Sequence, residues 1–417
     1  MARTLPATLA ALLLAAGCTG PDQRPVLPEP TGPHGVGSVR FLFTDSSRGE
    51  RFTADTSDFR EVALRAWYPA LKTSCVKRLP YVAAAAERKR LLPEGSPLPP
   101  GFFDRAANWL SNSYRDAAIP GHLPPFPVVL YSHSYGAGMS SATALMEELA
   151  SHGYVVVSVG HAFETSHFIR PDGTVRVFGF DNDLLRRIGS ERAKSFGWQR
   201  ALNRTADPGK LDSLVRGLMR ARPESMRSLE CWVEDIRFAI DRLAEMNDSG
   251  LFAGRLDLSR IGVIGHSFGG AASGQACLVE PRVRAGVNLD GLQVGDMVDR
   301  AVEVPFLFVH HDNPGAENPL VNLAFFERAR DTAYVVLVRG TRHLNFSDLS
   351  LPAIADALDL PEAALGPIDG LRCLRVVNDL VLAFFDRHLS GKNAPLLDDP
   401  LMAHPELELL RGAPRTD

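Results

Sequence analysis

Residues 261–270 read IGVIGHSFGG, an apolar run that passes directly into a G-x-S-x-G pentapeptide, and a helix-compatible stretch continues to Cys277. The apolar run predicts a strand, so the pentapeptide would form the sharp turn between a strand and a helix. Glycines on either side of Ser267 permit a strained backbone that lifts the hydroxyl above the sheet edge and brings the Phe268 N–H beside it. The stretch therefore predicts a nucleophilic serine, and the alternative is an ordinary turn with a buried or capping serine.

A nucleophilic serine needs a base and an orienting acid. In this architecture the acid and then the histidine follow the serine along the chain, each after a later strand. Residues 333–338 read AYVVLV and predict a strand, and the turn after them delivers His343. Because the chain contains 12 histidines, the prediction of His343 as general base rests on its place in this order.

Two aspartates compete for the role of the acid. The predicted strand 283–289 ends at Asp290, whereas the next one, 304–309, leads through a pair of histidines to Asp312. The commonest α/β-hydrolase arrangement would select Asp312. The residues alone therefore leave both candidates open.

Acyl transfer also needs two donors for the oxyanion that forms on the carbonyl, and the Phe268 N–H supplies one. Residues 127–136 read PVVLYSHSYG, a predicted strand that runs into a glycine-containing turn. We predict the Tyr135 N–H in this turn as the second donor. An ordinary turn that caps a helix from Met139 to Ser151 describes the same residues equally well.

Several blocks of the chain resemble the secreted or lipoprotein-associated type of platelet-activating-factor acetylhydrolase and its bacterial relatives, within the α/β-hydrolases. The blocks are EVALRAWYP at 61–69, PVVLYSHSYG at 127–136, the segment from Gly153 to His161, GHSFGG at 265–270 and GTRHLNFSD at 340–348. The resemblance implies an acid at the end of the strand right after the serine turn. Asp290, 23 residues beyond Ser267, fits that position and is favoured over Asp312.

At one position the chain departs from this family pattern. Ser134 stands where the family usually has glycine. We therefore expect the oxyanion loop either to be shifted or to place a hydroxyl in the site.

The composition predicts one sizeable α/β domain, 38–417, with a mostly parallel central sheet and helices on both faces. The 417 residues are 45% hydrophobic and 23% charged, and strand and helix patterns alternate throughout. A formal net charge of −4 gives no electrostatic reason to expect a nucleic acid as partner.

A long connection at about 162–225 interrupts this alternation and predicts a lid-like insertion that selects the substrate. Its aromatic residues are Phe178, Phe180, Phe196 and Trp198. Its basic residues include Arg186, Arg187, Arg192, Lys194, Arg200, Arg204 and Lys210. These cations either meet lipid phosphates or form a solvated helical face.

The N-terminus predicts export. Residues 1–17 carry one positive charge and a short Ala/Leu stretch, which indicates a signal peptide rather than a membrane span. The residues AAGC end at Cys18 and resemble a bacterial lipobox, so lipidation of Cys18 would anchor the protein to the envelope membrane; simple cleavage and secretion is the alternative. Residues 18–37 are rich in Pro and Gly and predict a tether.

Export would also permit disulfides between the remaining cysteines, which are Cys75, Cys231, Cys277 and Cys373. Their spacing selects no pairing, and buried free thiols are an equally good interpretation. The cysteines and histidines form no pattern that predicts a metal site.

The sequence and the resemblance together predict an exported serine esterase with a Ser267–His343–Asp290 triad and an acyl-enzyme, needing no cofactor and no metal. The expected substrates are short-acyl esters, namely platelet-activating-factor-like or oxidised phospholipids. One alternative is a broad carboxylesterase or polyester hydrolase of the same fold. Another, of a different class, is a catalytically silent α/β-hydrolase that acts as a surface binding module.

Overall fold

The computed structural model describes residues 25–72, 77–92, 98–170, 172–177, 183–202, 204–205, 207–312, 322 and 325–413. The predicted signal peptide and Cys18 lie outside these residues, as do Cys75, Phe178 and Phe180.

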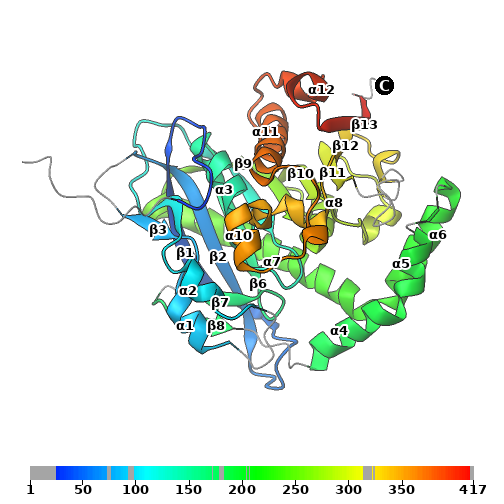
Figure 1. The fold of residues 1–417 in the computed structure, drawn as a ribbon, viewed down its shortest axis with the longest axis horizontal. Helices are drawn as coiled ribbons and strands as arrows, with labels where there is room; N and C mark the ends of the chain where they lie inside the picture. Colours follow the sequence, from blue (N-terminus) through cyan, green and yellow to red (C-terminus); the bar gives the residue numbers. More distant parts are fainter. Residues whose placement is uncertain are drawn as a thin grey trace, which may run out of the picture.

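A twisted central sheet organises the described part of the chain, which contributes eleven strands to it in the order β13-β12-β11-β10-β9-β5-β6-β2-β1-β4-β3 (Figure 1). A separate pair, β7 and β8, forms a small hairpin. The strands are β1 (Gly35–Gly49), β2 (Phe59–Ala70), β3 (Arg78–Pro80), β4 (Leu110–Arg115), β5 (Phe126–Ser132), β6 (Val155–His161), β7 (His167–Ile169), β8 (Val175–Val177), β9 (Leu256–His266), β10 (Val283–Leu289), β11 (Phe306–His311), β12 (Ala333–Val338) and β13 (Leu407–Ala413).

The centre of this sheet is parallel, from β6 through β5, β9, β10 and β11 to β12, while β2 and β13 join it antiparallel. Strands β5 and β6 are buried at every position, as expected for strands that helices cover on both faces. The predicted mostly parallel α/β architecture is thereby confirmed.

Two apolar clusters show how the helices cover the sheet. On one face, alternate residues of the strands pack with Trp232 and Ile236 of α7 and with Ala272 of α8. On the other face, they pack with Leu145 of α3 and Phe384 of α11. The helices are α1 (Ala85–Arg90), α2 (Phe102–Ala106), α3 (Thr143–Ser151), α4 (Asp183–Lys194), α5 (Phe196–Leu202), α6 (Pro208–Ala221), α7 (Pro223–Asp248), α8 (Phe268–Val279), α10 (Pro352–Ala357), α11 (Gly370–His388) and α12 (Pro400–Ala403).

The region predicted as an insertion contains the β7–β8 hairpin and helices α4, α5 and α6. The three green helices run along one side of the molecule in Figure 1. Helix α4 packs on α7, α5 packs on α6, and α6 reaches the short 3-10 helix Asp296–Val298. The insertion is thus attached at the end of the sheet where β10 and β11 finish.

The predicted tether, 18–37, differs from the structure over its second half. Leu27 is only 4% exposed, and the Thr31 N–H donates to a Glu148 carboxylate oxygen at 2.9 Å. Strand β1 then begins at Gly35. Residues 25–37 therefore pack against α3 and the sheet, because their few apolar and hydrogen-bonding groups find partners there.

The three cysteines of the described chain, Cys231, Cys277 and Cys373, are free thiols. Burial raises the pKa of Cys231 and Cys373 to about 12. Among the helices that the structure describes, none combines the length and the apolar character that crossing a bilayer requires.

Candidate active site

Ser267 occupies the sharp turn between β9 and α8 with φ +58°, in the sparsely populated region that marks strained, often functional backbone. Its N–H donates to the carbonyl of Leu289 on the neighbouring strand at 2.8 Å. The glycines of the pentapeptide make the turn possible, because a Cβ on Gly265 would lie 2.1 Å from the Gly269 carbonyl oxygen, and one on Gly269 would lie 2.1 Å from that of Ser132. The turn thus holds the serine at the carboxyl end of β9.

The structure brings Ser267, His343 and Asp290 together. The Nε2 atom of His343 lies 3.0 Å from the Ser267 Oγ, and its Nδ1 atom lies 2.6 Å from an Asp290 carboxylate oxygen. Because a carboxylate only accepts hydrogen bonds, Nδ1 carries the proton and Nε2 is left to accept from the serine hydroxyl. This tautomer is the one that a general base for Ser267 requires.

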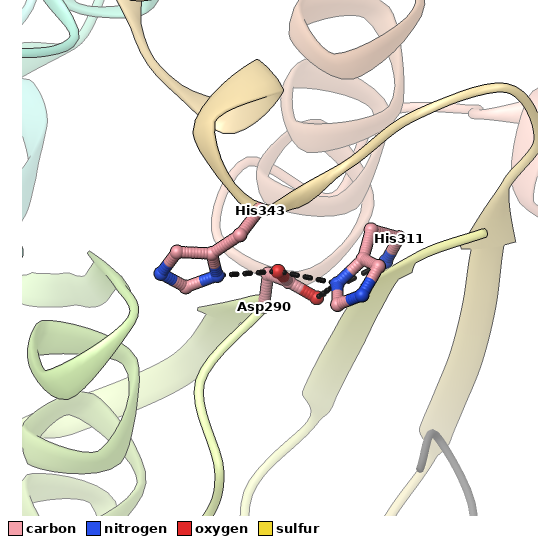
Figure 2. Close-up of side chains that lie close together, drawn as sticks. All are labelled: Asp290, His311 and His343. Carbon is pink, nitrogen blue, oxygen red and sulfur yellow. Dashed lines mark hydrogen bonds and ion pairs between the residues drawn. The ribbon is translucent and has the colours of Figure 1, made fainter. Parts of the chain in front are cut away.

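Asp290 has a second histidine partner that the sequence did not identify. His311, the last residue of β11, places its Nδ1 2.7 Å from both carboxylate oxygens, and its backbone N–H donates to one of them at 3.0 Å (Figure 2). Burial by itself would raise the pKa of Asp290, which is 1% exposed, but the hydrogen bonds from His311 and His343 hold that pKa well below its ordinary range. The carboxylate therefore stays ionised and orients His343.

Asp312, the other candidate for the acid, is not part of the hydrogen-bonded group of Ser267, His343 and Asp290. One of its carboxylate oxygens accepts the Gly340 N–H at 3.2 Å, at the exposed start of the turn that leads to His343. Strand β11 extends to His311, two residues beyond its predicted end, and this carries Asp312 past the site. The imidazole of His343 turns to Asp290 instead.

The cluster of Asp290, His311 and His343 also has the residue types of a metal site, with ligand atoms within 4.8 Å of one another. Two ligands of one tetrahedral zinc ion lie about 3.4 Å apart. The imidazole nitrogens here lie 2.6 and 2.7 Å from the carboxylate, the distances of direct hydrogen bonds. A metal could enter only by breaking these bonds, so the geometry is that of a hydrogen-bonded cluster.

The Tyr135 and Phe268 N–H groups have no acceptor among the described residues. Their side chains both pack on Trp232 of α7, the Tyr135 ring parallel to the indole at 6.1 Å and the Phe268 ring edge-on at 4.9 Å. The indole N–H in turn donates to Glu164 at 2.9 Å. Trp232 therefore braces both segments that carry the predicted oxyanion donors, a role that its helical spacing alone could not reveal.

Ser134, the departure from the family pattern, pairs with His266. Its Oγ lies 2.6 Å from the His266 Nδ1, while the Nε2 of His266 lies 3.0 Å from the His343 carbonyl oxygen. Burial, together with the nearby His343, lowers the pKa of His266 to about 3, so the ring is neutral. Since the carbonyl must accept, Nε2–H donates to it and Nδ1 accepts from Ser134. The serine hydroxyl thus links the oxyanion loop to the histidine loop.

A cavity of about 560 Å³ opens over these residues. One wall carries Ser267, Asp290 and His343 with Tyr135 and Phe268. The facing wall comes from the insertion and the start of α7, and includes Arg192, Phe196, Gln199, Leu218 and Met219. This volume lies in the range of small-molecule sites, and the predicted lid region supplies 7 of the 17 lining residues.

Comparisons with known proteins agree with this geometry. The model of the family described as platelet-activating factor acetylhydrolase, isoform II, matches residues 235–402, the part of the chain that contains Ser267, Asp290 and His343. A structure titled as a ferulic acid esterase from Streptomyces cinnamoneus superposes with a TM-score of 0.69 and 27% identity, covering 92% of this chain and 99% of that one. The chain has the α/β-hydrolase fold and is similar to platelet-activating factor acetylhydrolases.

Curated relatives of this α/β-hydrolase include proteins named platelet-activating factor acetylhydrolase. The one from Cavia porcellus is 26% identical over 63% of this chain and 58% of its own length. The one from Gallus gallus is 23% identical over 90% of this chain and 86% of its own length. The match thus spans less than two thirds of the Cavia porcellus protein, and likewise 57% of that from Bos taurus.

Proposed function

We propose that this protein is a serine-dependent carboxylic ester hydrolase. The observation that carries the proposal is the chain of hydrogen bonds from Ser267 to His343 to Asp290, at 3.0 and 2.6 Å, at the floor of an open cavity. Nucleophile, base and orienting acid in hydrogen-bond sequence are the arrangement that activates a serine. Relatives named as esterases and acetylhydrolases support the same reaction class.

In the proposed reaction, Ser267 Oγ attacks the ester carbonyl carbon while His343 Nε2 takes its proton. Asp290 holds the imidazole tautomer and stabilises the imidazolium that forms. The Tyr135 and Phe268 N–H groups, with Trp232 behind both side chains, donate hydrogen bonds to the carbonyl oxygen as it becomes negatively charged. The imidazolium then protonates the leaving alcohol, which leaves the acyl group on Ser267.

Water completes the cycle by the same steps. His343 deprotonates a water molecule, the hydroxide attacks the acyl-serine, and the proton returns to Ser267 as the acid departs. The low pKa of Asp290, which results from its two histidine partners despite burial, keeps the orienting charge in place throughout.

Replacement of the nucleophile tests this proposal. Ser267→Ala removes only the attacking oxygen, so kcat for p-nitrophenyl acetate should fall by at least about 10³-fold with the fold intact by circular dichroism. Ser273→Ala is the matched control, because Ser273 lies on α8, directly after the turn, and its hydroxyl donates to the Gly269 carbonyl at 3.0 Å. Labelling by a fluorophosphonate should follow the same pattern. Retention of more than about a tenth of kcat by Ser267→Ala would reject the proposal and favour a silent binding module.

For the substrate we propose short-acyl esters of the platelet-activating-factor or oxidised phospholipid kind. A relative from Arthroderma benhamiae, 32% identical over 36% of this chain, is named a probable 1-alkyl-2-acetylglycerophosphocholine esterase, and a cavity of about 560 Å³ has room for a small ester. The value of kcat/KM should decline stepwise from acetyl through butyryl and hexanoyl to palmitoyl at the second glycerol position. Each methylene that the acyl pocket cannot accommodate should raise the free energy of the transition state by about 1–3 kcal/mol. Equal turnover of the palmitoyl ester would overturn this preference.

The match to the ferulic acid esterase structure covers 92% of this chain and supports a second candidate function. In this alternative the protein is a broad carboxylesterase that does not act on phospholipids. Activity on simple or aromatic-acid esters, with none on glycerophosphocholines, would select it. Polyester hydrolysis belongs to the same alternative and can be measured on the same panel.

We also propose that the protein is exported and acts at a membrane. Export follows from the apolar leader, 1–17, and anchoring follows from lipidation of Cys18. Metabolic labelling with a palmitate analogue should mark the wild type and fail for Cys18→Ser. A labelled Cys18→Ser variant, or a soluble, unlabelled wild type, would contradict the anchor.

A further inference from the structure

Arg192 brings a positive charge from the insertion into the cavity that contains Ser267. The residue lies near the end of α4 and lines the cavity together with Ser267 and His343. The carbon at the centre of its guanidinium group lies 4.2 Å from the centre of the Tyr135 ring. The cation is therefore stacked on the residue whose N–H is the proposed second oxyanion donor.

The other arginines near this helix have acidic or hydroxyl partners. Arg186 pairs with Asp183, the Arg187 guanidinium lies 3.9 Å from Glu224, and the Arg222 Nε donates to Ser195 at 2.6 Å. Among the described residues, no carboxylate lies within 4.0 Å of the Arg192 guanidinium.

The acids around Arg192 do not neutralise it. Asp290 is the carboxylate in the lining of the main cavity, and its oxygens bind His311 and His343. Glu164 lines a smaller cavity of about 290 Å³ that Arg192 also borders, but burial raises the pKa of Glu164 and its carboxylate accepts the Trp232 N–H. The cavity beside the nucleophile is thus lined by an arginine, Arg192, that has no carboxylate within 4.0 Å among the described residues.

We propose that Arg192 recognises a phosphodiester anion on the alcohol side of the scissile ester, and so makes the enzyme select glycerophosphoesters over neutral esters. The guanidinium lies over the face of the Tyr135 ring, and an arginine in such a contact can still donate its N–H groups to oxygen atoms. An ester whose carbonyl oxygen accepts from the Tyr135 N–H would lie in the cavity that this cation also lines. The inference rests on the proposed esterase function and names the chemistry that its insertion selects.

The test compares two esters that differ only in the charged group. One is a short 1-alkyl-2-acetylglycerophosphocholine, and the other is the 1-alkyl-2-acetylglycerol that lacks the phosphocholine. Arg192→Gln should lower kcat/KM for the first by about tenfold to a hundredfold, mostly through KM, because a hydrogen bond to a charged group is lost. The value for the neutral ester should stay within about twofold.

Two further variants sharpen the result. Arg192→Lys keeps the charge without the planar fork and should fall between wild type and Arg192→Gln. Arg186→Gln on the same helix, whose partner Asp183 lies outside both cavities, should match the wild type on both esters. Raising the NaCl concentration should weaken the charge selectivity of the wild type and leave that of Arg192→Gln unchanged.

Each other outcome rejects the inference. Equal losses on both esters would mean that Arg192 only shapes the cavity, and no loss would mean that the phosphodiester binds elsewhere. Inhibition of the wild type by inorganic phosphate that disappears in Arg192→Gln, with unchanged ester selectivity, would indicate a site for free phosphate instead. Wild-type protein inactive on both esters would overturn the proposed function itself.

Discussion

The two walls of the cavity differ in how firmly their residues are held. On the sheet wall, Asp290 is 1% exposed and each of its carboxylate oxygens has a defined partner. On the insertion wall, Phe196 is 63% exposed and Arg192 is held by one stacked ring. The reaction requires the catalytic groups to be positioned to within a few tenths of an ångström, whereas selection among substrates depends on the size and charge of the cavity. These separate demands explain why the catalytic residues lie on the buried sheet wall and the residues that select the substrate lie on the exposed helices of the insertion wall.

The largest effect should arise on the sheet wall, from the orienting acid. Asp290→Asn would present an amide N–H to His343 and favour the wrong tautomer, so kcat for p-nitrophenyl acetate should fall by about 10⁴-fold. Asp312→Asn is the control that changes the same chemical group on the residue directly after β11, and it should cost less than about threefold. The reverse ranking would transfer the acid role to Asp312 and remove the basis for a rigid sheet wall.

A smaller effect is expected from His311, which contacts the Asp290 carboxylate and not Ser267. His311→Leu removes one donor to the carboxylate, so the pKa of Asp290 should rise toward its ordinary range and kcat should fall about tenfold. His311→Asn places an amide N–H near the lost Nδ1–H and should restore most of the activity. Measurement of kcat between pH 3 and pH 8 should show that the leucine variant loses activity at a higher pH, because a carboxylate with a less depressed pKa is protonated earlier as the pH falls. Equal defects in both variants, without this shift in pH dependence, would reduce His311 to a packing residue.

The smallest effect should come from the insertion wall. Phe196→Ala enlarges the cavity, so the ratio of kcat/KM for hexanoyl to acetyl p-nitrophenyl esters should rise about threefold to tenfold, with little change for acetyl itself. Trp198→Ala is matched to it, since Trp198 lies on the same helix but packs its ring against Gly217 of α6. Loss of acetyl turnover in Phe196→Ala would show that the insertion wall also fixes the chemistry, and would end the contrast between the walls.

Local patterns were sufficient for the central strands and for the order of the site residues. Strands 283–289 and 333–338 have the bounds predicted, because an alternating apolar pattern in the first and a continuous apolar run in the second end at turns. The positions of Ser267 and His343 after their strands follow from the same periodicity. Their roles in catalysis stay predictions until the variants are measured.

Contacts between distant segments explain what the sequence alone left open. Asp290 and Asp312 both follow strands, and only the two extra residues of β11 decide which carboxylate reaches His343. His311 and Trp232 carry no local signal, because their partners come from other elements. The outer strands β1 and β13 also escaped prediction, since mixed polar sequences form strands there only by pairing with β2 and β12.

The backbone amides of the site provide a hydrogen-exchange probe of its stability. The N–H of Ser267 donates to Leu289 and that of Asp290 to Val309, both at 2.8 Å, while the N–H of His311 donates to the Asp290 carboxylate at 3.0 Å. These residues stand at the ends of consecutive strands, where loop amides usually exchange quickly with solvent deuterium. Here the amides should exchange as slowly as those of the sheet interior. Deuterium uptake would therefore register a loosening of the acid and nucleophile before any loss of overall helix content.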